Sequence, residues 1–206
     1  AFIPSVARLR QVYRRIDYDL ELVRNGDRTV PPLYLASVPS GMGKVSQPAE
    51  RKRLFLRMML PLVLKVNEGV RKERDNLLRV KRLKETGAKL TNADRIYLRD
   101  MARLYGVGKP LVDLLLARVD VLPVSIALAQ SAIESGWGTS RFVREGNAPF
   151  GQWTTAAFKG IVPLQRESGK THKIRAFKNL YASVHSYILN LNTHRAYRGF
   201  RAMRKT

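Results

Sequence analysis

The 206-residue sequence contains no cysteine and few acidic residues. The lack of cysteine excludes disulfide bonds, cysteine-bound zinc and thiol nucleophiles, and it fits the cytosol or a bacterial envelope equally well. No apolar stretch reaches about 18 residues without a charge, so no membrane-spanning helix is predicted. Acids number 16 against 38 Lys and Arg, a net charge of +22. Such a chain is expected to bind a polyanion: nucleic acid, an anionic membrane or an acidic cell-wall polymer.

The composition is that of a folded protein, with 45% hydrophobic and 26% charged residues. Apolar periodicity predicts a mainly α (α+β) fold with one β-hairpin in residues 161–177. The stretch 29–48 is rich in Pro and Gly and is expected to be an irregular loop. The helices are expected over residues 5–24, 49–86 (interrupted or kinked near Pro61), 91–105, 111–118, 124–135, 180–192 and 194–204. The very polar stretch 68–84 is expected to face solvent, residues 91–94 resemble a capping box, and residues 168–171 are the expected turn of the hairpin.

One carboxylate stands out at the end of the predicted helix 124–135 (VSIALAQSAIES). Apolar and small residues surround this helix, so burial on nearly all sides is expected. Glu134 precedes Gly136, a natural helix C-cap. The negative end of the helix dipole and apolar neighbours, including Trp137, would both disfavour the ionised carboxylate, as a general acid requires. Gln130 and Ser131, one turn earlier, could orient it. The alternative is a buried Glu paired with a basic side chain.

Two segments make the chain resemble a known family. Residues 127–140 (ALAQSAIESGWGTS) resemble the signature of the glucosaminidase family of peptidoglycan hydrolases, and residues 147–153 (NAPFGQW) resemble the family's N-x-x-F-G segment. Within the family the likeness is greatest to bacterial Bax-like proteins, and it extends over most of the chain. The resemblance implies a lysozyme-like catalytic core with a small β-hairpin lobe in residues 91–206. Residues 1–90 would be an N-terminal helical extension that contains the long basic helix.

The resemblance also implies an activity. Glu134 would protonate the leaving glycosidic oxygen, and family members hydrolyse the bond after N-acetylglucosamine in peptidoglycan. Some members carry the description endo-β-N-acetylglucosaminidase acting on glycoproteins. The implied location is the bacterial envelope, periplasmic or otherwise extracytoplasmic. Because the sequence begins Ala1-Phe2, an upstream signal or anchor is expected to have been removed.

The predicted substrate cleft lies between the Glu134 helix end and the hairpin. Aromatic faces stack on sugars and a Gln amide can bind an N-acetyl group, so residues 150–153 are expected to form the cleft floor. Trp153 is the better candidate for sugar contact, and a core role is favoured for Phe150. The candidate substrate-binding residues are Gln130, Trp137, Phe150, Gln152 and Trp153.

The second catalytic group is open. Glycosidases usually use two carboxylates, and Glu167 is the acid within the predicted hairpin, although another register puts Gln165 there. Glu145 is a weaker candidate, since a salt bridge with Arg141 or Arg144 explains it. Tyr197 resembles a cleft tyrosine of the family, although His194 stands where the family has proline. An N-acetyl nucleophile, or elimination as in lytic transglycosylases, would need Glu134 alone.

No cofactor or metal is expected, because the three histidines lack zinc-type spacing. Basic residues concentrate in two places: residues 44–89 hold 14 against 5 acids, and residues 168–206 hold nine and no acid. A nucleic-acid-binding protein is therefore an alternative class, but no RNA-binding aromatic signature is present. A wall-binding protein with a dead site is a third. We expect peptidoglycan as partner and no nucleic acid, with contact to an anionic membrane surface left open.

Overall fold

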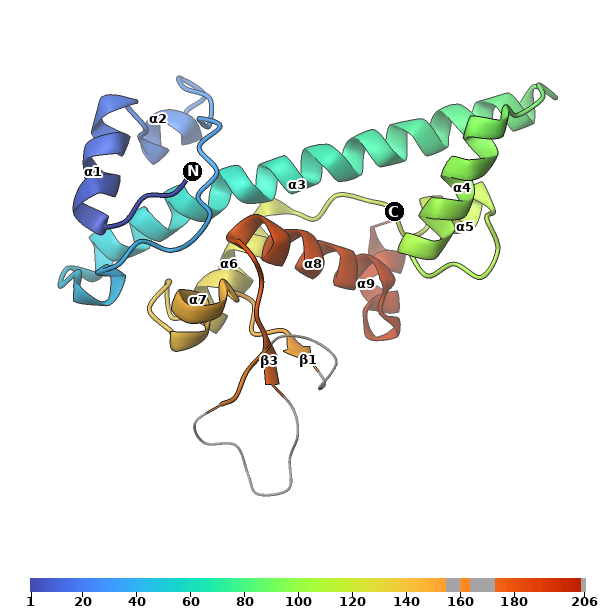
Figure 1. Cartoon of the computed structure of the whole chain (residues 1–206). Coiled ribbons are helices and arrows are strands. Elements are labelled where there is room, and N and C mark those ends of the chain that lie inside the picture. Colours follow the sequence, from blue (N-terminus) through green and yellow to red (C-terminus); the bar gives the residue numbers. More distant parts are fainter. Residues whose placement is uncertain (155–159, 164–172, 205–206) are drawn as a thin grey trace. The chain divides into compact units, whose positions relative to one another are not determined.

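The computed structural model describes residues 1–154, 160–163 and 173–204 (Figure 1). The chain divides into two compact units, which are described separately. Unit 1 comprises Ala1–Lys65 and Pro123–His185, and unit 2 comprises Val66–Leu122 and Ser186–Thr206. Helices dominate and one small antiparallel sheet is present, so the predicted mainly α (α+β) class is confirmed. The proposed division into residues 1–90 and 91–206 stays a prediction.

Unit 1 begins with two helices, α1 (Val6–Arg15) and α2 (Leu20–Arg24), beside the start of α3 (Figure 1). The single helix predicted for residues 5–24 is wrong, because Asp17 adopts a left-handed conformation with φ of 48°. This turn buries Tyr18, whose ring meets that of Tyr13 edge-on at 5.4 Å. Asp19 then caps α2 by accepting a hydrogen bond from the Glu21 N–H at 2.7 Å.

The segment 29–48 is irregular as predicted, apart from the short 3-10 helix η1 (Met42–Lys44) and an isolated bridge between Ser5 and Ser40. The long helix α3 (Pro48–Glu85) follows. It continues through Pro61, so the predicted interruption there is wrong, whereas a kink, the other predicted outcome, stays a prediction. Proline costs a helix one internal hydrogen bond, and the fully buried neighbours Met58 and Leu62 anchor the helix on both sides of that gap.

The rest of unit 1 carries the segments that resemble the glucosaminidase family. It contains α6 (Val124–Ser135), α7 (Arg141–Gly146) and the first turns of α8 (Leu180–Thr193). Residues 124–135 are helical, as the periodicity predicts. The large side chains of unit 1 that are fully buried are Leu9, Leu35, Met42, Phe55, Met58, Met59, Leu62 and Leu180.

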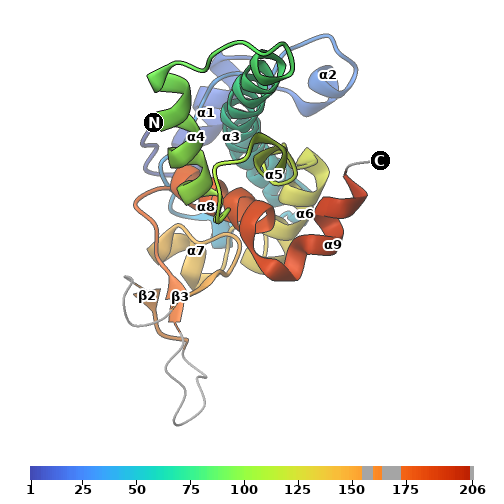
Figure 2. The same ribbon diagram turned by 90° about the vertical axis from the view of Figure 1, so that its right-hand side faces the viewer.

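The sheet of unit 1 has the order β1–β3–β2, with β1 (Trp153–Thr154), β2 (Gly160–Ile161) and β3 (Lys173–Arg175) antiparallel. Figure 2 shows β2 and β3 side by side. Their pairing, with Ile161 opposite Ile174, confirms two strands of the predicted hairpin. The strand β1 was not predicted, and the expected turn at residues 168–171 lies outside the described residues.

Unit 2 packs the second part of α3 with α4 (Asn92–Leu104), α5 (Val112–Leu116), η2 (Arg195–Tyr197) and α9 (Arg198–Met203). The predicted solvent exposure of the polar stretch 68–84 is wrong for one face, since Val70, Leu77 and Val80 are buried. Asn67 is also buried. Its amide donates to the Leu122 carbonyl at 2.7 Å and its carbonyl accepts from the Leu122 N–H at 3.0 Å.

The start of α4 is the capping box that the sequence predicts, formed by Thr91 and Asp94. The carboxylate of Asp94 accepts hydrogen bonds from Arg79 and from Thr91. These bonds, that from Arg79 foremost, lower the pKa of Asp94 from 3.8 to about 2. Among the described residues, no helix is both long and apolar enough to cross a membrane.

Candidate active site

Glu134 lies in the last turn of α6. The helix ends at Gly136, whose left-handed backbone (φ 56°) places the Trp137 N–H 2.9 Å from the Ala132 carbonyl. This is a glycine-terminated helix end of the kind that the sequence predicts. Glu134 therefore stands at the carbonyl end of α6, between the helix and the hydrogen-bonded turn that ends it.

The burial predicted for α6 is wrong. Its buried residues are Ala127, Ser131, Ala132 and Ser135, a narrow face of small side chains. Gln130 and Glu134 are exposed, and Ile133 is 76% exposed. These small residues let α6 pack closely against its neighbours, but only on one face. The apolar composition of the helix therefore does not mean that the helix is buried on all sides. In the described part of the chain, Glu134 is accessible rather than insulated by apolar groups.

The carboxylate of Glu134 has two defined neighbours. Gln130 donates its amide N–H to Oε1 at 3.3 Å, as expected of a residue that orients the acid. Gly151, with φ of 57°, lies beside Oε2: a Cβ at this position would stand 3.4 Å from that oxygen. Glu134 forms no ion pair with any described residue. Ser131, the other residue expected to orient it, is buried and donates instead to the Leu128 carbonyl.

The turn after α6 is held against α3. Gly136, Trp137 and Gly138 are all left-handed, with φ of 56°, 59° and 81°. The Trp137 ring meets Phe55 edge-on at 6.0 Å, and the Lys52 ammonium lies 5.2 Å from its centre. Gly138 is so close to Phe55 that a Cβ would stand 3.0 Å from Cδ2 of the ring. Trp137 thus anchors the turn, and its proposed contact with substrate stays a prediction.

The segment 147–154 leads from α7 into β1. Asn147 is left-handed (φ 50°) and its amide donates to the Phe177 carbonyl at 3.1 Å. Phe150 is buried, as the favoured core role requires. Gln152 is half-buried, and its Oε1 is buried without a hydrogen-bond partner among the described residues, whereas Trp153 is 72% exposed. An accessible indole is therefore present where the sequence predicts the cleft floor, but the Gln152 acceptor atom does not reach the surface.

The other catalytic candidates are less well placed by the structure. Glu145 pairs with Arg141 at 3.4 Å, which is the salt bridge that the sequence favours for it. Glu167 and Gln165 lie outside the described residues. Tyr197, at the end of η2, belongs to unit 2 and its ring lies 6.2 Å from that of His194. The roles of Glu167 and Tyr197 stay predictions.

Metal binding has no support in the described residues, which contain no cluster of three His, Asp or Glu side chains. Two neighbours of the site were missed by sequence reasoning. Phe55 is distant in sequence, and only the tertiary structure brings it to the turn. Gly151 was visible as a glycine after Phe150, but its positive φ and its contact with Glu134 depend on the fold.

The comparisons with known proteins concern the same region. Residues 109–206 match the glucosaminidase family model, described as mannosyl-glycoprotein endo-beta-N-acetylglucosaminidase. Residues 109–206 are therefore similar to the glucosaminidase family. The resemblance identified in residues 127–140 and 147–153 is thereby confirmed, and every candidate site residue lies within the matched range.

Two curated relatives extend this result. Protein bax of Escherichia coli (strain K12) is 33% identical over 190 residues, which is 89% of this chain. The chain spans 64% of the length of that relative. The peptidoglycan hydrolase FlgJ of Salmonella typhimurium is 37% identical over 70 residues, covering 30% of this chain and 22% of FlgJ. No solved structure matches the chain.

Proposed function

We propose that the protein hydrolyses the glycan strand of peptidoglycan, with Glu134 as the general acid. The observation that carries the proposal is the carboxylate itself. It is exposed at the end of α6, accepts a hydrogen bond from Gln130 and has no cationic partner among the described residues. The match to the glucosaminidase family model and the similarity to the hydrolase FlgJ support this substrate class.

The two oxygens of Glu134 suit different tasks. Oε1 accepts from Gln130, so a proton for the leaving group is better carried by Oε2. Beside Oε2 stands Gly151, whose missing side chain leaves room for a glycosidic oxygen. Protonation by a positioned carboxylic acid typically accelerates such a reaction by 10²–10⁴-fold. Gln130 fixes the rotamer from which the proton is delivered.

The finer assignment is cleavage after N-acetylglucosamine, an endo-β-N-acetylglucosaminidase reaction. The exposed ring of Trp153 is suited to stack on a sugar face. Gln152, next to it in sequence, is the proposed partner of the N-acetyl group. Glu167 is the proposed second carboxylate and Tyr197 a further cleft residue. Action on the wall implies a location in the bacterial envelope, and the net charge of +22 suits an acidic substrate.

The proposal is tested by the clearing of cell-wall material in a gel by Glu134→Gln, which keeps the size of the side chain. Glu145→Gln is the matched control, because it also removes one exposed carboxylate from unit 1. We expect loss of clearing of at least about 100-fold for Glu134→Gln and none for Glu145→Gln. Equal clearing by both variants would refute the assignment. Binding to sacculi without any clearing by the unaltered protein would favour a wall-binding function.

The bond that is cleaved can be read from the released ends by mass spectrometry. Reducing-end N-acetylglucosamine supports the glucosaminidase assignment. Reducing-end N-acetylmuramic acid would make the protein a muramidase, and an anhydro end a lytic transglycosylase that works with Glu134 alone.

A further inference from the structure

Unit 2 contains a cavity of about 390 Å³ in which arginines meet without acids. Arg118, Arg198 and Arg201, here called the arginine cluster, line it together with Val107, Gly108, Leu114, Ala117 and Ala202. Such a volume is in the range of small-molecule sites. The lining includes no Asp or Glu, so the positive charge of the cavity is not balanced by its own walls.

The hydrogen bonds of the cluster go to neutral groups. Arg118 donates to the carbonyls of Tyr105 and Thr193, at 2.6 and 3.3 Å. Arg201 donates to the carbonyls of Leu191 and His194, both at 2.9 Å. Carbonyl oxygens orient a guanidinium but carry no net charge. The two side chains are thus held in place while their charge stays uncompensated.

Neighbouring acids of unit 2 are engaged elsewhere. Asp113 pairs with Lys81 at 3.0 Å, and Asp120 lies 3.8 Å from Arg74. The Arg198 side chain is exposed and forms no ion pair or hydrogen bond with a described residue. Within the described part of unit 2, the cluster therefore has no anionic partner.

The cost of this arrangement is visible at Arg201, which is only 8% exposed. Desolvation, together with the charges of Arg118 and Arg198, lowers the pKa of Arg201. A buried charge is normally paired, and here two like charges add to the burial. An anion in the cavity would relieve both effects.

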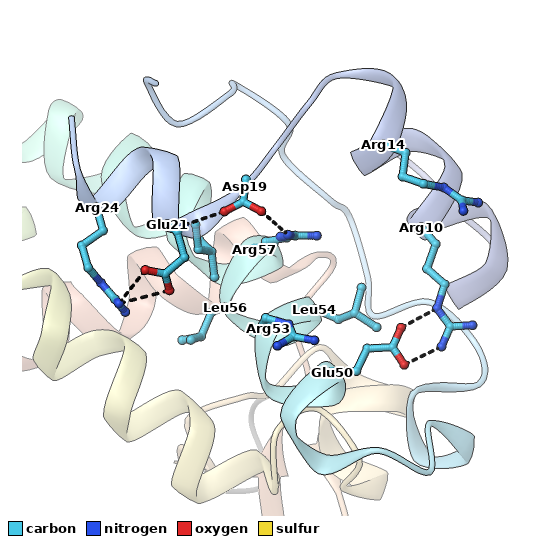
Figure 3. Close-up of a pocket in the computed structure, with 11 residues that line it drawn as sticks. Arg10, Arg14, Asp19, Glu21, Arg24, Glu50, Arg53, Leu54, Leu56 and Arg57 are labelled. Atoms are coloured by element: carbon cyan, nitrogen blue, oxygen red, sulfur yellow. Dashed lines mark hydrogen bonds and ion pairs between the residues drawn. The ribbon is translucent and has the colours of Figure 1, made fainter. Parts of the chain in front are cut away.

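A second cavity, in unit 1, also gathers arginines, but there carboxylates lie among them (Figure 3). Its volume is about 560 Å³ and three carboxylates lie among its five arginines. The carboxylate of Glu50 accepts hydrogen bonds from Nε and Nη2 of Arg10, at 2.8 and 2.9 Å. Glu21 pairs with Arg24 at 2.9 Å. The residues that line it are Arg10, Arg14, Asp19, Leu20, Glu21, Arg24, Arg53, Leu54, Leu56, Arg57 and Glu50.

We propose that the arginine cluster binds a phosphate monoester. A phosphate monoester carries about −1.5 to −2 charges and three strong acceptor oxygens, which suits three guanidiniums better than a carboxylate with one charge. The planar fork of arginine matches phosphate oxygens in pairs. The apolar walls at Val107, Leu114 and Ala117 suit the carbon skeleton of such a ligand. This site is independent of Glu134 and of the proposed hydrolysis.

The test is titration calorimetry of the intact protein with inorganic phosphate at fixed ionic strength. Arg198→Gln removes the exposed member of the cluster, and Arg195→Gln is the matched control, since Arg195 is exposed and does not line the cavity. We expect saturable binding that weakens about tenfold or more in Arg198→Gln, equal to about 1.4 kcal/mol, and less than about twofold in Arg195→Gln. Circular dichroism checks that both variants fold.

Three results would overturn the proposal: no saturable binding of phosphate, equal weakening by the two variants, or acetate that competes as well as phosphate does. Two further titrations identify the source of the phosphate. Saturable binding of glycerol 3-phosphate, without association with vesicles, supports a soluble ligand. Association with phosphatidylcholine vesicles only when they contain phosphatidic acid, reversed by inorganic phosphate and lost in Arg198→Gln, supports a lipid headgroup.

Discussion

Replacement of Gly138 by alanine measures how tightly the turn after α6, residues 136–138, is held on α3. The backbone of Gly138 is left-handed (φ 81°), which costs an alanine about 1–2 kcal/mol. The added Cβ would stand 3.0 Å from a carbon of Phe55, which is fully buried and has little freedom to move. Overpacking of this kind costs about 1–3 kcal/mol. We therefore expect Gly138→Ala to lose about 2–5 kcal/mol of unfolding free energy.

The matched control is Gly26→Ala, also in unit 1. Gly26 has almost the same φ, 84°, but nothing lies within 4 Å of its added Cβ. Gly26→Ala should therefore lose only the free energy of the strained backbone. The unfolding free energies of the two variants should differ by the overpacking contribution, about 1–3 kcal/mol. Both tryptophans, Trp137 and Trp153, belong to unit 1, so urea unfolding followed by their fluorescence reports on this unit. Equal losses in the two variants would refute the packing argument.

Three further predictions follow from single residues. Gly151→Ala should lower kcat on soluble wall fragments about tenfold or more, because the added methyl group would fill the space beside Oε2 of Glu134 that is proposed for the glycosidic oxygen. An unchanged kcat would contradict this role of Gly151. The hydrogen bond from Arg79 and the lowered pKa of Asp94, about 2, stabilise the fold above about pH 4 and are lost as the pH falls toward 2. The thermal midpoints of the unaltered protein and Asp94→Asn should therefore converge over that range, and a constant gap would contradict this. Asn67→Leu leaves the buried N–H and carbonyl of Leu122 without their hydrogen-bond partner. The variant should lose more than about 2 kcal/mol of unfolding free energy, measured by urea unfolding followed by circular dichroism.

Local signals in the sequence predicted local structure well. The capping box at Thr91 and the glycine that ends α6 are found where short-range chemistry predicts them. One exception is Pro61, through which α3 continues. Another is the break at Asp17. There the apolar stripe runs on without a proline or glycine, and burial of Tyr18 decides the turn instead. Periodicity alone does not show that a tertiary contact outweighs helix continuation.

The candidate site divides in the same way. The identity of Glu134 and its hydrogen bond from Gln130 follow from residue type and helical spacing. The exposure of Glu134 does not follow from the sequence. A helix of small residues has the same composition whether other elements pack against one of its faces or against all of them. The ring contact between Trp137 and Phe55 joins residues that are 82 positions apart in the sequence. No pattern in a single sequence predicts such a pair.

The contact between the turn after α6 and α3 also sets a limit on which piece of the chain can work alone. The family match begins at residue 109, but Lys52 and Phe55, on which Trp137 and Gly138 rest, come long before it. A fragment trimmed to the matched residues would keep Glu134 and lose the surface that supports its turn. The smallest active fragment should therefore start upstream of Pro48, at a point that similarity to the family alone does not reveal.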